Sequence, residues 1–106
     1  METKIVYHYS FEPFDKFDIT KADGFWFTTI KPNETEMLEE IGADCANYAA
    51  KCEISFDNPL LNASNYDVEK TLAGSEHDAI ENRYEGYIDY ALIDSEKIKI
   101  IEWSKI

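Results

Sequence analysis

Short runs of apolar residues, separated by polar and turn-forming residues, recur along the whole chain and define its predicted elements. Ile5, Val6 and Tyr7 lead the first run, and β-branched and aromatic residues favour extended strands. The run from Gly24 to Thr29 is apolar at most positions, which predicts a strand buried on both faces or at the edge of a cleft. Strands are predicted over Lys4 to Ser10, Gly24 to Thr29, Cys52 to Phe56, Tyr87 to Ile93 and Lys97 to Trp103.

A helical spacing of residues follows Asp44. Cys45, Tyr48, Ala49 and Cys52 recur at positions i, i+3, i+4 and i+7, which would place them on one face of a short helix. This segment is therefore predicted to be helical up to the strand that starts at Cys52.

Turn and capping residues define the other predicted helices. Asn33, followed by Glu36, has the spacing of an N-cap and its reciprocal partner, and Gly42 is placed to end that helix. Because short helices separate groups of strands, the chain is predicted to have an α+β fold. Two further helices are predicted over 68 to 74, after Ser64 and Asp67 at capping-box spacing, and over Glu76 to Arg83.

Length and charge limit the classes of function. At 106 residues the chain is predicted to be a single domain over 1–106, and 44% hydrophobic residues argue against disorder. Its 22 acidic and 10 basic residues give a formal net charge of −12, which argues against direct binding of nucleic acid. A basic protein surface is the expected partner, and the alternative is that the charge only keeps the domain soluble.

The two cysteines and the first residues of the chain predict neither a metal site nor a membrane anchor. Cys45 and Cys52 lack metal-ligand spacing and are expected to be buried free thiols. No apolar run approaches the length that spans a membrane, and the N-terminal residues do not have the pattern of a signal peptide. The sequence therefore predicts a cytoplasmic protein.

Five segments are informative as an ordered series. They are Tyr7-His8, Gly24 to Thr28, Ala46 to Ala49, Asn58 to Leu60, and Asp89 to Ile98. This series resembles the motifs of the ADP-ribosyltransferase-like superfamily, particularly the compact versions in phage polyvalent proteins and bacterial toxins, and is similar in kind to ADP-ribosylating anti-CRISPR proteins. The resemblance extends over most of the chain and implies a small split β-sheet or sandwich core with short helices between strand groups.

The resemblance also implies an NAD site. In that family a histidine donates a hydrogen bond to a ribose hydroxyl of NAD, the backbone beside it holds the nicotinamide amide, and aromatic rings sandwich the nicotinamide. An acid stabilises the cation that forms as nicotinamide leaves, and its counterpart here is Asp89. The counterparts implied in NAD binding are His8, Tyr9, Trp26, Thr28 and Tyr48.

The residue types suit this chemistry independently of any resemblance. Breaking the nicotinamide glycosidic bond builds positive charge at the sugar, as glycoside hydrolysis does. A fixed carboxylate in a dry cleft favours that charge most in the transition state. Aromatic faces hold a cationic pyridinium ring by stacking and cation–π attraction.

The series departs from the family at three positions. Many relatives have glycine at Tyr9, tyrosine at Trp26 and glutamate at Asp89, and the shorter acid lies about one methylene further from a bound ribose. Glu85 and Asp94 are rival acids close by. Asp89 is preferred because it directly precedes the apolar segment 90–93.

Each of these side chains also has a structural interpretation. His8 could be a hydrogen-bonded core histidine, Trp26 and Tyr48 could simply pack, and Asp89 could be a solvated strand residue. Two functions are therefore weighed. The first is NAD-dependent ADP-ribosylation of a target protein, as in a phage-encoded inhibitor of host defence. The alternative is a non-catalytic acidic protein that blocks a nucleic-acid-binding partner by charge mimicry.

Overall fold

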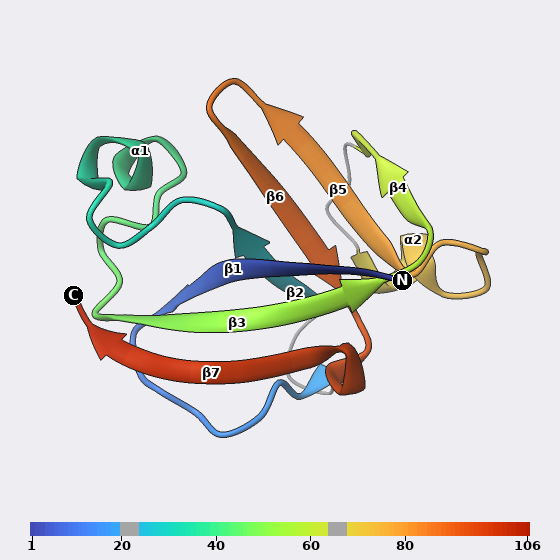
Figure 1. Cartoon of the computed structure of the whole chain (residues 1–106), viewed down its shortest axis with the longest axis horizontal. Coiled ribbons are helices and arrows are strands. Elements are labelled where there is room, and N and C mark those ends of the chain that lie inside the picture. The colour runs from blue at the N-terminus through green and yellow to red at the C-terminus, as the bar shows by residue number, and fades with distance from the viewer. Residues whose placement is uncertain (20–23, 64–67) are drawn as a thin grey trace.

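The computed structural model describes residues 1–19, 24–63 and 68–106, which form one seven-stranded mixed β-sheet with two short α-helices (Figure 1). The fold is therefore α+β. The strands are β1 (Glu2–Ser10), β2 (Phe25–Thr28), β3 (Tyr48–Phe56), β4 (Pro59–Leu61), β5 (Ala79–Tyr84), β6 (Tyr87–Leu92) and β7 (Ile98–Lys105), and the helices are α1 (Thr35–Glu40) and α2 (Val68–Leu72).

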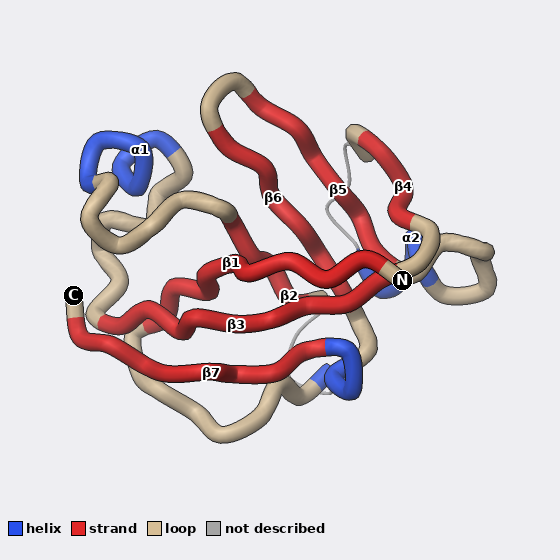
Figure 2. The backbone as a smooth tube through the Cα atoms, in the orientation of Figure 1, coloured by secondary structure: helices blue, strands red, loops and turns tan. Residues whose placement is uncertain are grey.

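The strands lie in the order β4-β5-β6-β2-β1-β3-β7, and only the β4–β5 pair is parallel. The contact between β1 and β2 is the narrowest in this series, because their register consists of the single pair Tyr7 and Thr28. By contrast, β1 pairs with β3 along its full length, from Glu2 to Ser10. The sheet thus has two halves joined at one point, and in Figure 2 β5 and β6 run steeply across the direction of β1, β3 and β7.

The main core lies on one face of this sheet. Val6 on β1, Phe27 on β2 and Tyr90 on β6 are almost completely buried there. The loop after β1 covers the face with Phe14 and Phe17, and the indole N–H of Trp103 donates a hydrogen bond to the carbonyl oxygen of Phe14 at 3.0 Å. This loop ties β1 to β7 and closes the core on that side.

A second, smaller apolar cluster lies where α2 packs against β5 and β6. It consists of Val68, Leu72, Ile80 and Ala91. Gly24, just before β2, lies against this helix so closely that a Cβ atom there would be 2.5 Å from the Cβ of Val68. The glycine is therefore required by the close packing of α2 against the start of β2.

The segment from 45 to 52 is not a helix, and that prediction is wrong. Tyr48 to Phe56 form strand β3, paired with β1 on one side and β7 on the other. Ala50, Cys52, Ile54 and Phe56 are buried at every second position, which is the period of a strand. Pairing on both edges outweighs the helical spacing and the helix propensity of the alanines.

Two further helix predictions need correction. Residues 79–84 of the polar segment expected to be helical form strand β5, in which Glu81 and Asn82 are buried. The N-cap of α1 is Glu34 and not Asn33, and its side chain accepts a hydrogen bond from the N–H of Lys31 at 2.9 Å. The predicted cap at Ser64 and Asp67 lies outside the described residues.

Other predictions agree with the structure. Strands overlap each of the five predicted strand segments, and Gly42, with φ of +75°, follows the end of α1 as a helix-terminating glycine does. Of the two cysteines, Cys52 is buried and Cys45 is exposed in the turn after α1, so the expectation of two buried thiols holds for Cys52 alone. Burial raises the pKa of the Cys52 thiol to about 12.

Candidate ligand-binding pocket

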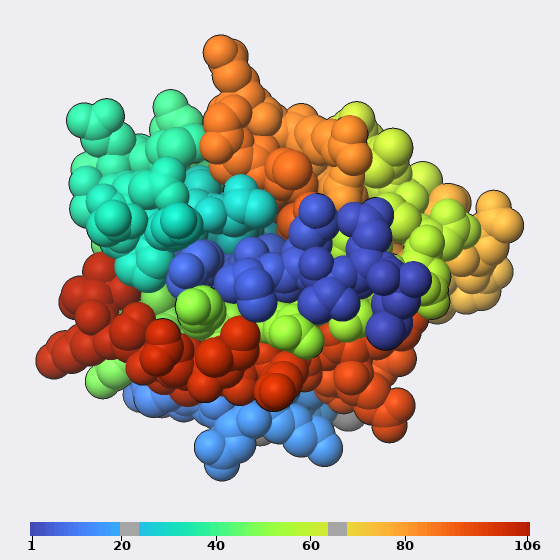
Figure 3. Space-filling view, in the orientation of Figure 1, coloured from blue at the N-terminus to red at the C-terminus, as the bar shows by residue number. Residues whose placement is uncertain are grey.

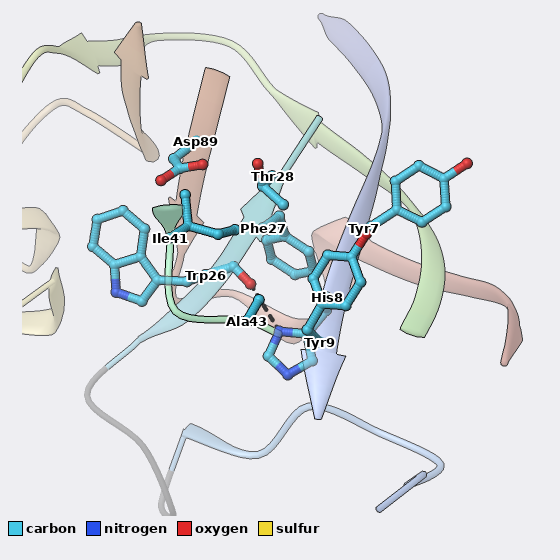
Figure 4. A pocket seen from close by; sticks show the side chains of 9 residues that line it. All are labelled: Tyr7, His8, Tyr9, Trp26, Phe27, Thr28, Ile41, Ala43 and Asp89. Carbon is cyan, nitrogen blue, oxygen red and sulfur yellow. Dashed lines mark hydrogen bonds between the residues drawn. The ribbon is translucent and has the colours of Figure 1, made fainter. Parts of the chain in front are cut away.

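A pocket of about 310 Å³ lies where β1 and β2 separate. Figure 4 shows the side chains that surround it, which come from β1, β2, β6 and the turn after α1. These segments are far apart in the sequence and are brought together by the sheet order. The lining residues are Tyr7, His8, Tyr9, Trp26, Phe27, Thr28, Ile41, Ala43 and Asp89.

A row of directly paired residues crosses the sheet beneath the pocket. Asn82 on β5 pairs with Asp89 on β6, Asp89 pairs with Thr28 on β2, and Thr28 pairs with Tyr7 on β1. Paired residues in antiparallel strands project their side chains from the same face. The carboxyl of Asp89 therefore has an amide on one side and a hydroxyl on the other, on the face opposite the main core.

His8 reaches the pocket from the core side. Its ring packs against Phe14, Phe17 and Phe27, with centroid distances of 5.7, 5.0 and 5.8 Å. Its Nδ1 atom lies 2.7 Å from the carbonyl oxygen of Trp26, drawn as a dashed line in Figure 4. Because that carbonyl can only accept, Nδ1 carries the proton. Burial lowers the pKa of His8, more than this hydrogen bond raises it, so the ring is held neutral.

The tyrosines on either side of His8 project from the opposite face of β1, because side chains alternate along a strand. The hydroxyl of Tyr9 donates a hydrogen bond to the carbonyl oxygen of Ile30 at 2.6 Å. This bond bridges β1 to the segment after β2, past the point where the strands cease to pair. The pKa of Tyr9 is raised, first by burial and then by Tyr7 and Glu34, so the phenol stays protonated.

Trp26 is the most accessible aromatic ring of the pocket. Its side chain is 39% exposed although it lies in a central strand, where a large apolar residue would normally be buried. In Figure 4 its indole lies on the same side of the pocket as Asp89. An exposed indole beside a carboxyl can hold a flat, positively charged ring.

The turn after α1 forms the other wall of the pocket, and the segment that contains α1 and this turn is strongly acidic. Ile41 and Ala43 line the pocket from this turn. The surrounding segment 34–44 contains five carboxylates and no lysine or arginine. In Figure 3 this segment stands on the surface beside the β5–β6 hairpin, with β1 crossing the middle of the same face.

Asp89 is the acid of the pocket. Its Oδ1 atom is buried and has no hydrogen-bond partner among the described residues. Burial raises the pKa of Asp89, and the neighbouring Thr28 hydroxyl lowers it by less. A carboxyl with a raised pKa in a cleft is a common property of functional acids. Neither rival acid lines this pocket, since Glu85 is exposed in the β5–β6 turn and Asp94 caps the 3₁₀ turn Ser95–Lys97.

Of the six residues proposed from the sequence, five line the pocket and one does not. His8, Tyr9, Trp26, Thr28 and Asp89 are brought together, but His8 and Asp89 approach from opposite faces of the sheet. Thr28 is almost completely buried, and its hydroxyl accepts a hydrogen bond from the N–H of Ile30. Tyr48 lies at the start of β3, where it pairs with Ser10 and Lys105, and is separated from β2 by β1.

Some pocket residues were missed. Tyr7 has the same orientation as Tyr9, and the two-residue period of a strand was the signal that could have identified it. Ile41 and Ala43 line the pocket because of the path that the chain takes after α1, and no sequence pattern predicts that path. Asn82, which does not line the pocket but pairs with Asp89, was missed because its segment was interpreted as a surface helix.

The chain matches no protein-family model, and a comparison with curated proteins finds no relative. No helix among the described residues is long and apolar enough to cross a membrane.

Proposed function

We propose that the pocket binds NAD and that the protein transfers ADP-ribose from NAD to a basic target protein. The observation that supports this most is that five residues chosen for an NAD site, from three separate strands, line one pocket. These residues are His8, Tyr9, Trp26, Thr28 and Asp89.

The residues present suit a cationic aromatic group in particular. The exposed face of Trp26 would stack on the pyridinium ring of NAD, a contact worth about 0.5 to 2 kcal/mol. The volume of about 310 Å³ suits the nicotinamide end of NAD, with the rest of the molecule extending out of the pocket. The carboxyl of Asp89 lines the same pocket as this indole, where its oxygen on the pocket side can face a positive or proton-donating group.

NAD would supply the ADP-ribosyl group, whose bond to nicotinamide breaks with the electron pair leaving on the ring nitrogen. Asp89, once ionised, would stabilise the positive charge that develops at the ribose carbon. The acceptor atom of the target would then bond to that carbon and lose a proton. No lysine or arginine lines the pocket among the described residues, so the charge of Asp89 is not neutralised there in advance.

The role of His8 follows from its tautomer. Nδ1 donates to the carbonyl oxygen of Trp26, and the lowered pKa keeps the ring neutral, so Nε2 is an acceptor. His8 would therefore accept a hydrogen bond from a ribose hydroxyl, where the family pattern has a donor. Its second role is to fix the backbone of Trp26, which sets the position of the indole.

The acidic surface supports a basic protein as the acceptor. Segment 34–44, which carries five carboxylates, contributes Ile41 and Ala43 to the pocket wall, and the whole chain has a net charge of −12. Such a field attracts positively charged partners and repels nucleic acid. A nucleic-acid-binding protein presents the complementary basic surface.

A transfer assay tests this function directly. The protein is incubated with labelled NAD and a panel of purified basic nucleic-acid-binding proteins, and label on the target is measured. Wild type and the Glu85→Gln control should transfer label, whereas Asp89→Asn should lose at least about 100-fold in rate, the usual cost of removing one electrostatic stabiliser. Absence of NAD binding to the wild-type protein in calorimetry would rule the proposal out.

The second candidate is a non-catalytic protein that blocks a basic partner by charge mimicry. The continuous acidic segment 34–44 favours it. In that case Asp89→Asn would bind the partner as tightly as wild type, and affinity would fall steeply with salt. Exchange of Glu36, Glu39 and Glu40 for glutamine would weaken binding, although NAD would have no effect.

A further inference from the structure

Two buried side-chain oxygens have no hydrogen-bond partner among the described residues, and they belong to directly paired residues. They are Oδ1 of Asn82 on β5 and Oδ1 of Asp89 on β6. Both side chains project from the pocket face of the sheet, and cross-strand neighbours of this kind have Cβ atoms about 4.5 to 5.5 Å apart. Side chains of this length can meet at that separation.

The hydrogen bond made by its amide nitrogen fixes the orientation of the Asn82 side chain. Nδ2 donates a hydrogen bond to the carbonyl oxygen of Ala63 at 3.3 Å, on the side of β4. Exchanging the amide nitrogen and oxygen would set two acceptors against each other at Ala63, so the present orientation is the favourable one. Oδ1 of Asn82 is therefore turned away from Ala63, and the side chain is only 8% exposed.

An ionised Asp89 would leave two buried acceptors side by side without a donor. Each unsatisfied buried polar atom costs about 1 to 3 kcal/mol. Both oxygens are closed to solvent, and a single proton between them would satisfy both. A protonated carboxyl supplies that donor, because it has one O–H group.

We propose that Asp89 carries a proton on Oδ1 in the resting protein and donates it in a hydrogen bond to Oδ1 of Asn82. Asn82 is then a positioning residue, which turns one carboxyl oxygen inward and leaves the other to face the pocket. Asp89 ionises when a cationic group enters beside it or when the pH is raised. This inference concerns the state of the acid and holds for any cationic ligand.

The groups around Asp89 favour the neutral form. Tyr87, two residues earlier on β6, is influenced by the charges of both Asp89 and Glu40 of α1. Tyr84 on β5 stacks on Tyr87, with ring centroids 4.9 Å apart. Thr28 on β2 adjoins Asp89, and Tyr7 and Tyr9 line the pocket from β1. None of these residue types carries a positive formal charge that would favour the ionised carboxylate. The raised pKa of Asp89, which burial causes, agrees with this arrangement.

Carbon-13 NMR of side-chain Cγ atoms tests the pair in the wild-type protein. The Cγ shifts of Asp89 and Asn82 are followed from about pH 3 to pH 8, with exposed Asp44 and Asn47 as internal controls. Asp89 should titrate above Asp44, and Asn82 should shift with the same midpoint as Asp89 while Asn47 does not follow it. An Asp89 carboxyl that is already ionised at pH 7 in the ligand-free protein, or an Asn82 signal that is unchanged through the Asp89 transition, would overturn the proposal.

A pair of variants gives a second measurement. Asp89→Asn places an amide N–H where the carboxyl O–H donates, so this variant should be at least as stable as wild type at pH 8 in urea denaturation. The difference should disappear at low pH, where Asp89 of the wild type is protonated. In an Asn82→Leu background the same substitution should lose this advantage, because its acceptor is gone. Lower stability of Asp89→Asn at pH 8 would contradict the shared proton.

Discussion

Nδ1 of His8 lies 2.7 Å from the carbonyl oxygen of Trp26, at the place where β1 and β2 cease to pair. The imidazole N–H donates where a backbone N–H would donate in a continuous pair of strands. It thereby joins the two halves of the sheet beyond the pair Tyr7 and Thr28. The same bond fixes the backbone that carries the indole of the pocket. The histidine that we propose for ligand binding thus also has a structural role.

Substituting His8 should separate these two roles. His8→Ala removes both the ring packing and the hydrogen bond, and should lower the free energy of unfolding by about 2 to 4 kcal/mol. His8→Gln retains an N–H donor and should lose less. Urea denaturation of both variants checks this, and equal stability of His8→Ala and wild type would show that the bond to Trp26 contributes nothing.

The pH dependence of stability provides a second test of His8. Burial lowers its pKa in the folded protein, so the unfolded state binds the proton more tightly. The resulting loss of free energy of unfolding is absent well above the unfolded pKa of about 6.5. It grows as the pH falls through that pKa towards the folded pKa. The free energy of unfolding of wild type should therefore drop more than that of His8→Gln between pH 8 and pH 5.

Trp26 is expected to matter for binding more than for stability. Because its side chain is 39% exposed, Trp26→Ala should change the free energy of unfolding by less than about 1.5 kcal/mol. Loss of a cation–π contact should weaken NAD binding by about 2- to 30-fold. Tyr84→Ala is a matched control, since Tyr84 is an exposed aromatic residue outside the pocket lining. Calorimetric titration with NAD would show equal losses in both variants if Trp26 were not in the site.

Asp78 should be the acid on which stability depends. Its carboxylate accepts hydrogen bonds from the N–H groups of Asp57 and Asn58, at 2.7 and 2.9 Å, and from Lys97 at 2.9 Å. Burial acts to raise the pKa of Asp78, but these donors together lower it below its usual value. Its contribution is therefore present above the unfolded pKa of about 3.9 and is lost as the pH falls through the folded pKa.

Asp78→Ala should accordingly cost about 2 to 3 kcal/mol at pH 7, since it leaves two backbone donors without their acceptor. The cost should shrink as the pH falls below the unfolded pKa of about 3.9. Asp94→Ala, which removes only the cap of a 3₁₀ turn, should cost about 1 kcal/mol. Thermal denaturation at pH 7 and pH 3 measures both, and a pH-independent cost for Asp78→Ala would contradict the hydrogen-bond explanation.

Strands β1, β2, β6, β7 and the second half of β3 could be predicted from local residue preference, whereas β4, β5 and the first half of β3 could not. Ile5 to Tyr7 and Phe25 to Thr28 are rich in strand-forming residues, so β1 and β2 follow from local preference. The segment 45–52 satisfies a helical and a strand period at once. Whether this segment forms a helix or a strand is decided by its pairing with β1 and β7, which arises only in the folded sheet.

Strand β5 could not be predicted from the sequence for a different reason. Glu81 and Asn82 look like surface residues, yet Glu81 is 4% exposed and is paired with Arg83 at 2.7 Å. The ion pair lies within β5, but the burial of Glu81 arises only once the strands are assembled. The position of Asn82 beside Asp89 depends on that same register, so the candidate acid could be named from the sequence and the residue that positions it could not.

The affinity for NAD should depend on pH through Asp89. If the resting carboxyl is protonated, a bound pyridinium ring favours its ionisation, so binding releases a proton. Affinity should then rise by up to tenfold per pH unit below the raised pKa of Asp89 and level off above it. Titration calorimetry in buffers of different ionisation enthalpy would detect the released proton. Asp89→Asn should bind without this slope, and identical slopes for the variant and wild type would assign the dependence to another group.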